Sequence, residues 1–246
     1  MCGRFVSTNS PDRIAAYFGA SFDEPREHPD LPANYNVAPT NDVYAVVATV
    51  TDAPPVVRPF HWGLVPSWAK DVKIGSRMIN ARSETIADKP AFKKLFATRR
   101  VLIPMDGFYE WQQVTGQKAK QPMYIHRRDS EPLAVAGLWS MWRDREAGPD
   151  APWLHSCTVI TTSANATMAP VHDRMPVLVP PTRWHEWLDP DNADLDMLRA
   201  LMVPAPDDLL TMHPVSTSVN HVRNKGADLI DEIDPAQPVV PPQPTS

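Results

Sequence analysis

The chain has few cysteines, no long apolar run and no segment that resembles a signal peptide. Each absence argues against a class of protein. Its 246 residues include two cysteines, Cys2 and Cys157. Two cysteines build no disulfide framework, which favours a protein of the reducing cytosol. No run of roughly 18 or more apolar residues is present, so we expect no membrane span. The first residues lack a basic segment followed by an apolar run, so we expect no secretory signal.

The usual zinc-binding motifs are also absent. Neither C-x-x-C nor H-E-x-x-H occurs, and these spacings are common ways to place zinc ligands. We therefore expect no metal and no other cofactor. No internal repeat is visible, which argues against a solenoid or a propeller.

What the sequence does contain is enough apolar material for a core. Hydrophobic residues make up 43% of the chain and tryptophans number 8, so we expect a globular protein. No linker interrupts the middle of the chain, and we expect a single domain over residues 2–230. Residues 231–246 form a proline-rich tail that we expect to be disordered.

The 28 prolines favour short elements joined by fixed turns. Apolar runs predict strands at 4–6, 43–51, 101–104, 122–128, 133–141, 153–162, 175–179 and 209–215, with a further short strand beginning at Arg58. Helices are expected between the N-cap Ser10 and Gly19, from Pro90, and over 182–188 and 193–202. Many short strands and few helices, without regular alternation of the two, predict an α+β fold.

The net charge of −5 hides an uneven distribution. From Arg58 to Arg100 five lysines and five arginines stand against three acidic residues, a balance of +7. From Asp189 to the end ten acidic residues stand against three basic ones, a balance of −7. A basic stretch offset by an acidic one is compatible with an anion-binding face. Two ordinary solvated surfaces are the alternative.

Cys2 is the first candidate for chemistry. Because its side chain is small, we expect removal of Met1 to make Cys2 the N-terminal residue, with an α-amine beside a thiol. The reference pKa is about 7.7–8.0 for an α-amine and about 8.5 for a thiol, so a fraction of each is nucleophilic near neutral pH. The amine can condense with an aldehyde, and the thiol can then close a thiazolidine ring. A buried, unreactive cysteine is the alternative.

Three other polar residues have surroundings that suit chemistry. Glu110 lies within the sequence F-Y-E-W, where desolvation would favour its protonated form and let it act as a general acid. His172 lies in a loop between two predicted strands and is a natural proton shuttle. Asn80 can orient an amine or a sugar oxygen without adding charge. The ordinary alternatives are a solvated strand glutamate, a loop histidine bound to a carbonyl group and a turn asparagine.

Tryptophans and cations gather within the basic stretch. Trp62 and Trp68 flank a loop that contains glycine and proline, and Arg77 and Arg82 follow. Aromatic rings that stack on bases and cations that hold phosphates are what single-stranded nucleic-acid sites use. The pattern therefore predicts a single-strand binding surface, and buried tryptophans are the alternative.

Six short motifs, in this order, resemble the SOS-response-associated peptidase (SRAP) family. They are M-C-G-R-F at 1–5, Y-N-V-A-P-T at 35–40, W-G-L-V-P-S-W at 62–68, N-A-R-S-E at 80–84, G-F-Y-E-W at 107–111 and H-D-R-M-P at 172–176. The resemblance spans residues 2–230. It implies a mainly antiparallel, bifurcated or barrel-like β core flanked by short helices. Two features depart from the family: Met105 stands where a small residue is usual, and the segment 220–230 follows the pattern only loosely.

Members of this family shield abasic sites in single-stranded DNA through a covalent cross-link from the N-terminal cysteine. The resemblance therefore implies that Cys2 is the covalent residue and that Asn80, Glu110 and His172 surround it. The implied partner is single-stranded DNA that contains abasic sites, with no metal and no membrane involved. The implied place is the bacterial cytoplasm, at the nucleoid. Lyase-type chemistry and self-removal of Met1 are further expectations.

The resemblance also implies contacts to the DNA backbone. Arg82 and Arg174 each lie two residues after a polar site residue and are expected to grip the backbone. Arg4, two residues after Cys2, is a further expected phosphate contact.

Two other classes of function stay open at this stage. An amidohydrolase with an N-terminal nucleophile also begins M-C-G and uses the thiol against an amide, but such enzymes usually carry an Asn-Gly segment that this chain lacks. A cysteine peptidase built from Cys2, His172 and Asn80 is a related possibility. The third class is a binding module that uses only its tryptophans and arginines.

Overall fold

The computed structural model describes residues 2–22, 30–51, 53–116 and 118–234. Its strands are β1 (Phe5–Ser7), β2 (Ser21–Phe22), β3 (Asn34–Val37), β4 (Asp42–Val47), β5 (Val56–Trp62), β6 (Asn80–Arg82), β7 (Arg100–Met105), β8 (Gly107–Gln112), β9 (Gln121–Arg127), β10 (Leu133–Trp142), β11 (Leu154–Ser163), β12 (Arg174–Pro176) and β13 (Leu210–Pro214). The α-helices are α1 (Pro11–Phe18), α2 (Pro90–Thr98), α3 (Trp184–Leu188) and α4 (Leu195–Ala200). Short 3-10 helices are η1 (Val72–Arg77), η2 (Ser83–Thr85), η3 (Pro181–Arg183), η4 (Thr217–Asn220) and η5 (Ala227–Ile230).

Five strands close into a barrel. β11 pairs with β10, β10 with β7, β7 with β4 and β4 with β5, and β5 returns to pair with β11. Only the closing pair, β5 with β11, is parallel. Beyond the barrel the end of β11 lies between β6 and β12, because Thr161 pairs with Arg82 on one side and with Pro176 on the other.

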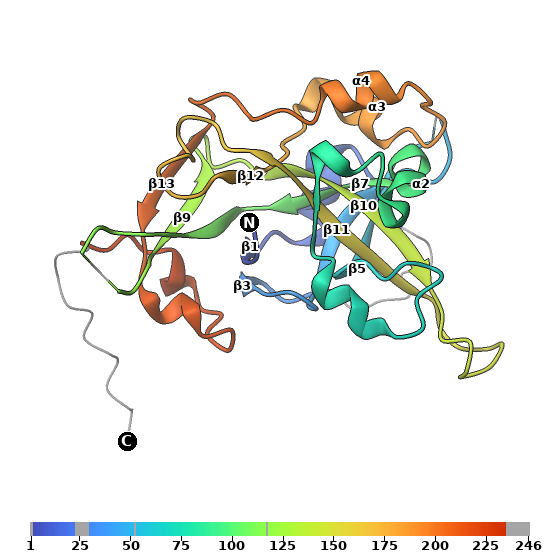
Figure 1. Cartoon of the computed structure of the whole chain (residues 1–246), viewed down its shortest axis with the longest axis horizontal. Helices are drawn as coiled ribbons and strands as arrows, with labels where there is room; N and C mark the ends of the chain where they lie inside the picture. Colours follow the sequence, from blue (N-terminus) through green and yellow to red (C-terminus); the bar gives the residue numbers. More distant parts are fainter. Residues whose placement is uncertain (1, 23–29, 52, 117, 235–246) are drawn as a thin grey trace.

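A second sheet packs against this barrel (Figure 1). Its strands follow the order β13-β9-β8-β1-β3, and all its pairings are antiparallel. Side chains of both sheets share one apolar cluster, in which Phe5 and Phe108 meet Phe60 and Val159 of the barrel. The first strand of the chain is therefore a central strand, with β8 on one side and β3 on the other.

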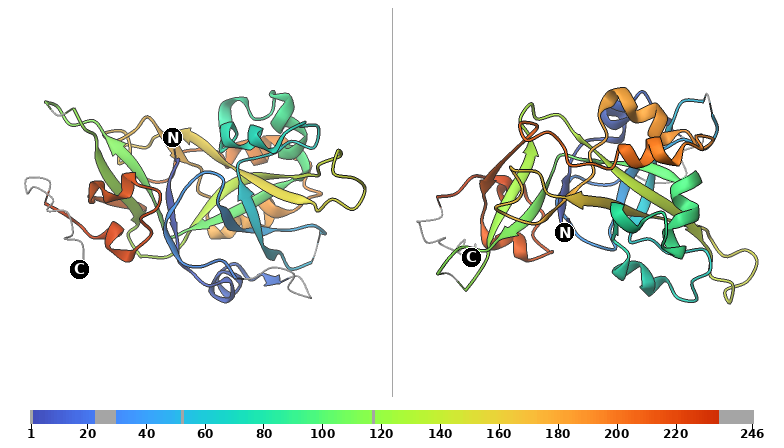
Figure 2. Two further views of the ribbon diagram at one scale, coloured as in Figure 1. Left: turned by 90° about the horizontal axis from the view of Figure 1, so that it is seen from below. Right: turned by 45° about the horizontal axis from the view of Figure 1, so that its top comes forward.

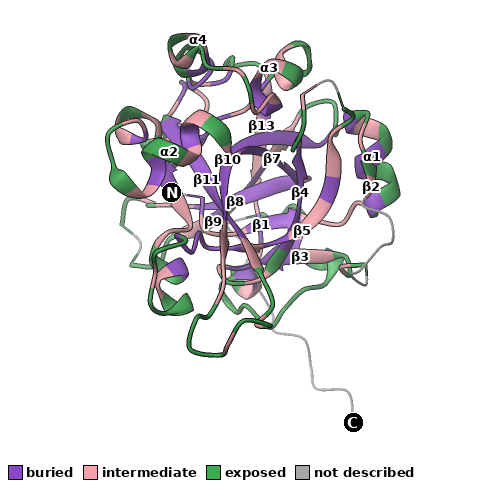
Figure 3. Ribbon diagram, turned by 90° about the vertical axis from the view of Figure 1, so that its right-hand side faces the viewer, coloured by how far each residue is buried: buried purple, intermediate pink, exposed green. Residues whose placement is uncertain are grey.

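The barrel strands are buried on both faces, as β4 illustrates. Val43, Ala45 and Val47 belong to the cluster inside the barrel, whereas Tyr44 and Val46 belong to the cluster under the helices. A strand with two covered faces needs no polar residues, which explains the continuous apolar run. Figure 3 shows the buried strands at the centre, with the helices exposing their outer faces.

The sequence-based prediction of an α+β fold with a barrel-like, mainly antiparallel core is confirmed. The strands predicted at 122–128, 133–141, 153–162 and 209–215 correspond to β9, β10, β11 and β13. The strand predicted at 43–51 ends at Val47, where a turn begins. β3 was not predicted, because prolines and polar residues surround it and its stability comes from pairing with β1.

The end of the described chain still pairs with the domain. Glu232 forms a bridge with Val215, and the Ile233 N–H donates to the Pro214 carbonyl oxygen at 3.0 Å. Pairing therefore continues past residue 230, and the remainder of the predicted tail, 235–246, lies outside the described residues. Within the described residues no helix is long and apolar enough to cross a bilayer.

Candidate functional site

The N-terminal segment lies along β8, the strand that carries Glu110. Phe5 pairs with Phe108, and the Tyr109 N–H donates to the Arg4 carbonyl oxygen at 2.9 Å. The charge of Glu110 also acts on the pKa of the Cys2 thiol, so the two side chains lie near each other. The sequence immediately around Cys2 thus runs past the carboxylate that was predicted to serve it.

Gly107 lets β8 pair closely with its other neighbour, β9. A Cβ at this position would lie 2.5 Å from the Tyr124 ring and 2.6 Å from the Ile125 carbonyl oxygen. The Ile125 carbonyl oxygen is backbone of β9, which pairs with β8, so it cannot shift without moving the strand. Any larger residue at position 107 would push β9 away from β8.

Cys2 is buried, with 1% of its surface exposed. Burial raises the pKa of its thiol above the ordinary range, and the negative charge of Glu110 raises it further. The Arg4 backbone N–H, which hydrogen-bonds to the sulfur, acts in the opposite direction. The net effect is a thiol that stays protonated at neutral pH in this arrangement, so a base must remove its proton before it acts as a nucleophile.

Asn80 contacts the first residue directly. Its Nδ2 donates to the Cys2 carbonyl oxygen at 2.9 Å. Its Oδ1 is buried and has no hydrogen-bond partner among the described residues. Asn80 opens β6, which pairs in parallel with β11 through Val159. One end of the side-chain amide is therefore engaged at Cys2, while the other end presents an unused acceptor.

Trp62 positions this part of the site. Its ring is 0% exposed and packs edge-on against Phe5, with centroids 4.9 Å apart. Its Nε1 donates to the Ile79 carbonyl oxygen at 3.0 Å, one residue before Asn80. The prediction that Trp62 stacks on bases does not fit this position, because a fully buried ring cannot touch DNA. Trp62 instead joins the strand after Cys2 to the segment before Asn80.

Glu110 lies on the strand that contacts the loop carrying His172. Glu110 is 4% exposed on β8. Gln112, two residues along and so on the same face of the strand, donates from Nε2 to the Pro170 carbonyl oxygen at 3.2 Å. This bond ties that face of β8 to the 164–173 loop between β11 and β12.

His172 has two possible partners for one ring nitrogen. Its Nδ1 lies 2.9 Å from the Arg174 backbone nitrogen and 2.9 Å from Asp173 Oδ1. The unprotonated Nδ1 accepts from the Arg174 N–H, whereas a protonated Nδ1 pairs with the Asp173 carboxylate. The residues that follow His172 in the chain therefore hold its ring in place.

The two arginines expected to grip DNA differ in their surroundings. Arg82 is exposed at the end of β6. Arg174 pairs with Glu84, at 2.5 Å from Nη1 to Oε1 and 3.0 Å from Nη2 to Oε2, and Nη2 also donates to the Thr161 carbonyl oxygen at 2.6 Å. Arg82 is thus available to a phosphate, while Arg174 must first exchange Glu84 for one.

Arg4 is turned towards the protein. Its Nη1 donates to Asn36 Oδ1 at 2.7 Å and to the Val219 carbonyl oxygen at 2.8 Å. The guanidinium also lies over the Trp111 ring, 5.8 Å from the centroid. Burial lowers the pKa of this guanidinium. These contacts assign Arg4 a role in holding the structure, which the sequence did not suggest.

The other predicted tryptophan, Trp68, is 62% exposed beside a surface hollow. The hollow has a volume of about 560 Å³ and is lined by Trp68, Lys70, Lys73 and Arg77, with Asp71 as its acidic member. It lies on the segment that leads through η1 to Asn80. An exposed indole among cations is the arrangement that the sequence predicted for this stretch.

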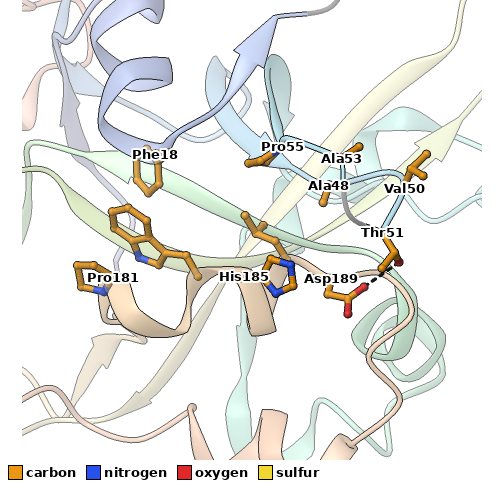
Figure 4. A pocket seen from close by; sticks show the side chains of 11 residues that line it. Phe18, Ala48, Val50, Thr51, Ala53, Pro55, Pro181, His185 and Asp189 are labelled. Carbon is orange, nitrogen blue, oxygen red and sulfur yellow. Dashed lines mark hydrogen bonds between the residues drawn. The ribbon is translucent and has the colours of Figure 1, made fainter.

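A separate apolar pocket lies on the helical side of the barrel. It has a volume of about 270 Å³ and lies between the β4–β5 connection and α3 (Figure 4). Phe18, Trp184 and His185 line it, and none of the predicted site residues does. Among the residues that the structure describes, no group of three or more His, Cys, Asp or Glu side chains is placed to hold a metal ion.

Comparison with known proteins places this geometry in context. The family model described as SOS response associated peptidase (SRAP) matches residues 1–222. The chain is 39% identical over 233 residues to the abasic site processing protein YoqW of Bacillus subtilis (strain 168), which covers 94% of this chain and 99% of that protein. It is 30% identical over 235 residues to the abasic site processing protein YedK of Escherichia coli (strain K12), covering 95% and 100%.

The fold also has solved counterparts. An X-ray structure of a protein from Bacteroides thetaiotaomicron matches with a TM-score of 0.80 at 21% identity, covering 94% of this chain and 100% of that one. At this identity the likeness bears on the fold alone, and it agrees with the barrel and second sheet described above.

Proposed function

Because the chain belongs to the SOS response associated peptidase (SRAP) family, we propose that it processes abasic sites in single-stranded DNA by forming a covalent cross-link through Cys2. Its relatives YoqW and YedK carry the name abasic site processing protein. The observation that carries the proposal is the hydrogen bond from Asn80 Nδ2 to the Cys2 carbonyl oxygen, at 2.9 Å. This bond brings the Asn80 amide next to the residue that carries the proposed nucleophiles.

The reaction begins with hydrolysis of the Met1–Cys2 peptide bond, which gives Cys2 a free α-amine. An abasic deoxyribose is in equilibrium with its open-chain aldehyde. Glu110, beside the N-terminal segment, protonates the ring oxygen to promote opening. The amine then attacks the aldehyde carbon, and water leaves as the Schiff base forms. Asn80 Oδ1, buried and without a partner among the described residues, is the acceptor that holds the amine.

The thiol completes the adduct. The Cys2 sulfur adds to the imine carbon, the S–H proton passes to the imine nitrogen, and a thiazolidine ring forms. The net reaction joins protein and DNA with loss of one water. His172, whose ring is held in place through Nδ1, moves protons at the sugar during closure or reversal.

Ring closure protects the DNA strand. An imine alone promotes β-elimination, which nicks the strand, so the amine without the thiol would act as a lyase. The thiazolidine has no C=N bond and removes that route. The amine reacts first, and the sulfur is needed only once the imine has formed.

The test is a single-stranded oligonucleotide with one abasic site, mixed with the protein and then denatured. We expect a band that survives denaturation, whose intact mass equals that of the protein without Met1 plus the oligonucleotide, less one water. Cys2→Ser should lose the stable adduct and retain nicking. An adduct of the same stability from Cys2→Ser would overturn the role of the thiol, and turnover of amides or peptides without an adduct would favour the amidohydrolase class.

A further inference from the structure

The segment 220–225 is a surface loop whose backbone is fastened to the site. Asn36, 0% exposed, lies below it. Its Nδ2 lies within hydrogen-bonding distance of the carbonyl oxygens of Val219 (3.1 Å), His221 (3.1 Å) and Asn224 (2.9 Å). Two carbonyl groups of the loop, and that of Val219 just before it, are thus turned inward towards one buried amide, while residues 220–225 are exposed to solvent.

The residues that hold this loop are neighbours of the proposed catalytic residues. Arg4, two residues from Cys2, donates to the Val219 carbonyl oxygen and to Asn36. Trp111, adjacent to Glu110, donates from Nε1 to Asn220 Oδ1 at 2.7 Å. The loop is thus attached to the N-terminal segment through Arg4 and to β8 through Trp111. It lies at the edge of the site.

Alternate residues of the 220–225 loop carry basic side chains. His221, Arg223 and Lys225 are exposed. Neither Arg223 nor Lys225 forms an ion pair with any residue that the structure describes. No aspartate or glutamate occurs between 219 and 227, although the C-terminal part of the chain as a whole is acidic. The fold therefore brings two uncompensated cations of an acidic region to the edge of the site.

The loop and the Trp68 hollow lie on opposite sides of the N-terminal strand. In Figure 1 the segment that contains 217–230 lies to the left of β1, and the segment 66–77 lies to its right. Both views in Figure 2 keep this order. A single strand of DNA that enters at the hollow and passes the N-terminal segment would continue towards the 220–225 loop.

We propose that the 220–225 loop binds the DNA strand on the side of the lesion opposite the Trp68 hollow, with Arg223 and Lys225 as phosphate contacts and Arg4 as the residue that positions the loop. This inference rests on the proposed function, because it takes abasic single-stranded DNA as the ligand. Lysine and arginine bind phosphates without regard to sequence, which suits a protein that meets lesions anywhere.

The test uses two short oligonucleotides of about eight nucleotides, a length within the range of single-strand sites. Each ends in a tetrahydrofuran abasic analogue, one at the 5′ end and the other at the 3′ end. The analogue has no aldehyde, so fluorescence anisotropy measures reversible binding alone. Arg223→Gln/Lys225→Gln should weaken binding of one oligonucleotide and leave the other unchanged, and Lys73→Gln/Arg77→Gln should show the reverse preference.

Salt dependence provides a second readout. With an oligonucleotide flanked on both sides, Arg223→Gln/Lys225→Gln should lower the slope of log K against log salt by about 1.4, since each phosphate contact on single strands contributes about 0.7. Lys93→Gln/Lys94→Gln, on the exposed face of α2, is the matched control with the same charge change. Asn36→Ala, which removes no charge, should lower the slope in the same direction by releasing the loop.

Two outcomes would contradict the proposed contact of the 220–225 loop with DNA. If the Arg223/Lys225 variant keeps the wild-type slope, or if both double variants weaken the same oligonucleotide, the loop does not bind the opposite flank. Wild-type cross-linking to a true abasic oligonucleotide is measured separately and tests the proposed function. A wild-type protein that fails to cross-link while the flank preferences hold would leave a non-covalent binding module with the same DNA path.

Discussion

Asn80 donates a hydrogen bond from Nδ2 to the carbonyl oxygen of Cys2, so the residue proposed to orient the amine already holds the backbone of the residue that bears it. The two are 78 positions apart in the chain. Asn80 reaches Cys2 because β6 pairs in parallel alongside β11, while Trp62 ties the segment before β6 to the strand after Cys2. Removing that hydrogen bond should therefore lower the cross-linking rate while changing the stability of the fold only slightly.

Asn80→Asp keeps the size of the side chain and removes the donor. One hydrogen bond contributes about 1 kcal/mol, so we expect cross-linking about fivefold slower, with a change in melting temperature of only a few degrees. The rate is measured from the denaturation-resistant band over time. Asn192→Asp, near α4 and remote from Cys2, is the control, and an Asn80→Asp rate equal to the wild-type rate would remove Asn80 from the mechanism.

Glu110→Gln should have two effects, one from each protonation state of the side chain. It removes the acid form that donates a proton to the ring oxygen, so cross-linking should slow by roughly 10²-fold. It also removes a negative charge that raises the pKa of the Cys2 thiol, so alkylation of Cys2 by iodoacetamide at about pH 8.5 should accelerate. Peptide mass mapping distinguishes Cys2 from Cys157. Parallel losses in both reactions would indicate a structural change and count against the assignment.

Trp62 and Trp68 should respond in opposite ways to alanine. Trp62→Ala empties a buried site and should cost about 3–5 kcal/mol in the free energy of unfolding. Trp68→Ala should leave unfolding unchanged and weaken single-strand binding by about 1–3 kcal/mol, the contribution of a stacked base. Chemical denaturation and anisotropy measure the two quantities, and undiminished binding by Trp68→Ala would exclude the hollow as a stacking site.

Glu84 should compete with DNA for Arg174. Glu84→Gln removes the ion pair and leaves the guanidinium free to meet a phosphate. Since exposed pairs contribute up to about 1 kcal/mol, we expect single-strand binding roughly threefold tighter. Glu186→Gln, which breaks the exposed pair with Arg183, is the matched control. Weaker binding by Glu84→Gln would mean that the pair itself shapes the DNA contact.

Stability should decline at alkaline pH. Burial raises the pKa of both Cys2 and Cys157 above the ordinary value for a thiol. Groups whose folded-state pKa is raised contribute stability that is present below the unfolded pKa and lost as pH rises above it. Above about pH 9 each thiol should lower the free energy of unfolding by up to about 1.4 kcal/mol per pH unit.

Denaturation at several pH values tests this decline. Cys157→Ala, compared with its own stability at pH 7, should show a shallower fall above pH 9 than the wild-type chain. Burial also raises the pKa of Tyr109 and Tyr124, so part of the decline remains in any cysteine variant. A fall of equal steepness in both proteins would mean that the Cys157 thiol ionises freely in the folded state.

Much of the fold was predictable because local patterns carry it. Apolar runs between turn residues identified the strands from β9 to β11, and Ser10, Pro11 and Gly19 marked the ends of α1, where Ser10 caps the helix and Gly19 has a positive φ of 61°. β3 and β6 escaped prediction because each is short and stabilised by pairing with a strand distant in sequence.

Chemistry and motif order proposed the members of the candidate site, Cys2, Asn80, Glu110 and His172. The structure adds contacts around them that the sequence did not indicate, such as the hydrogen bond from Asn80 to the Cys2 carbonyl oxygen. No pattern indicated that Arg4 holds the Val219 carbonyl oxygen, or that Arg174 would be engaged by Glu84.

The sequence by itself determined the α+β class, because short apolar runs are local properties of the chain. It also proposed the reactive group, because a nucleophile at the second residue is visible without any tertiary contact. Only the tertiary structure decided which cations face solvent, which tryptophan is buried and which amide reaches Cys2. Those outcomes depend on contacts between residues far apart in sequence. Such contacts bury Trp62, which supports the fold, whereas Trp68 stays exposed at the surface. Both residues nevertheless belong to one motif.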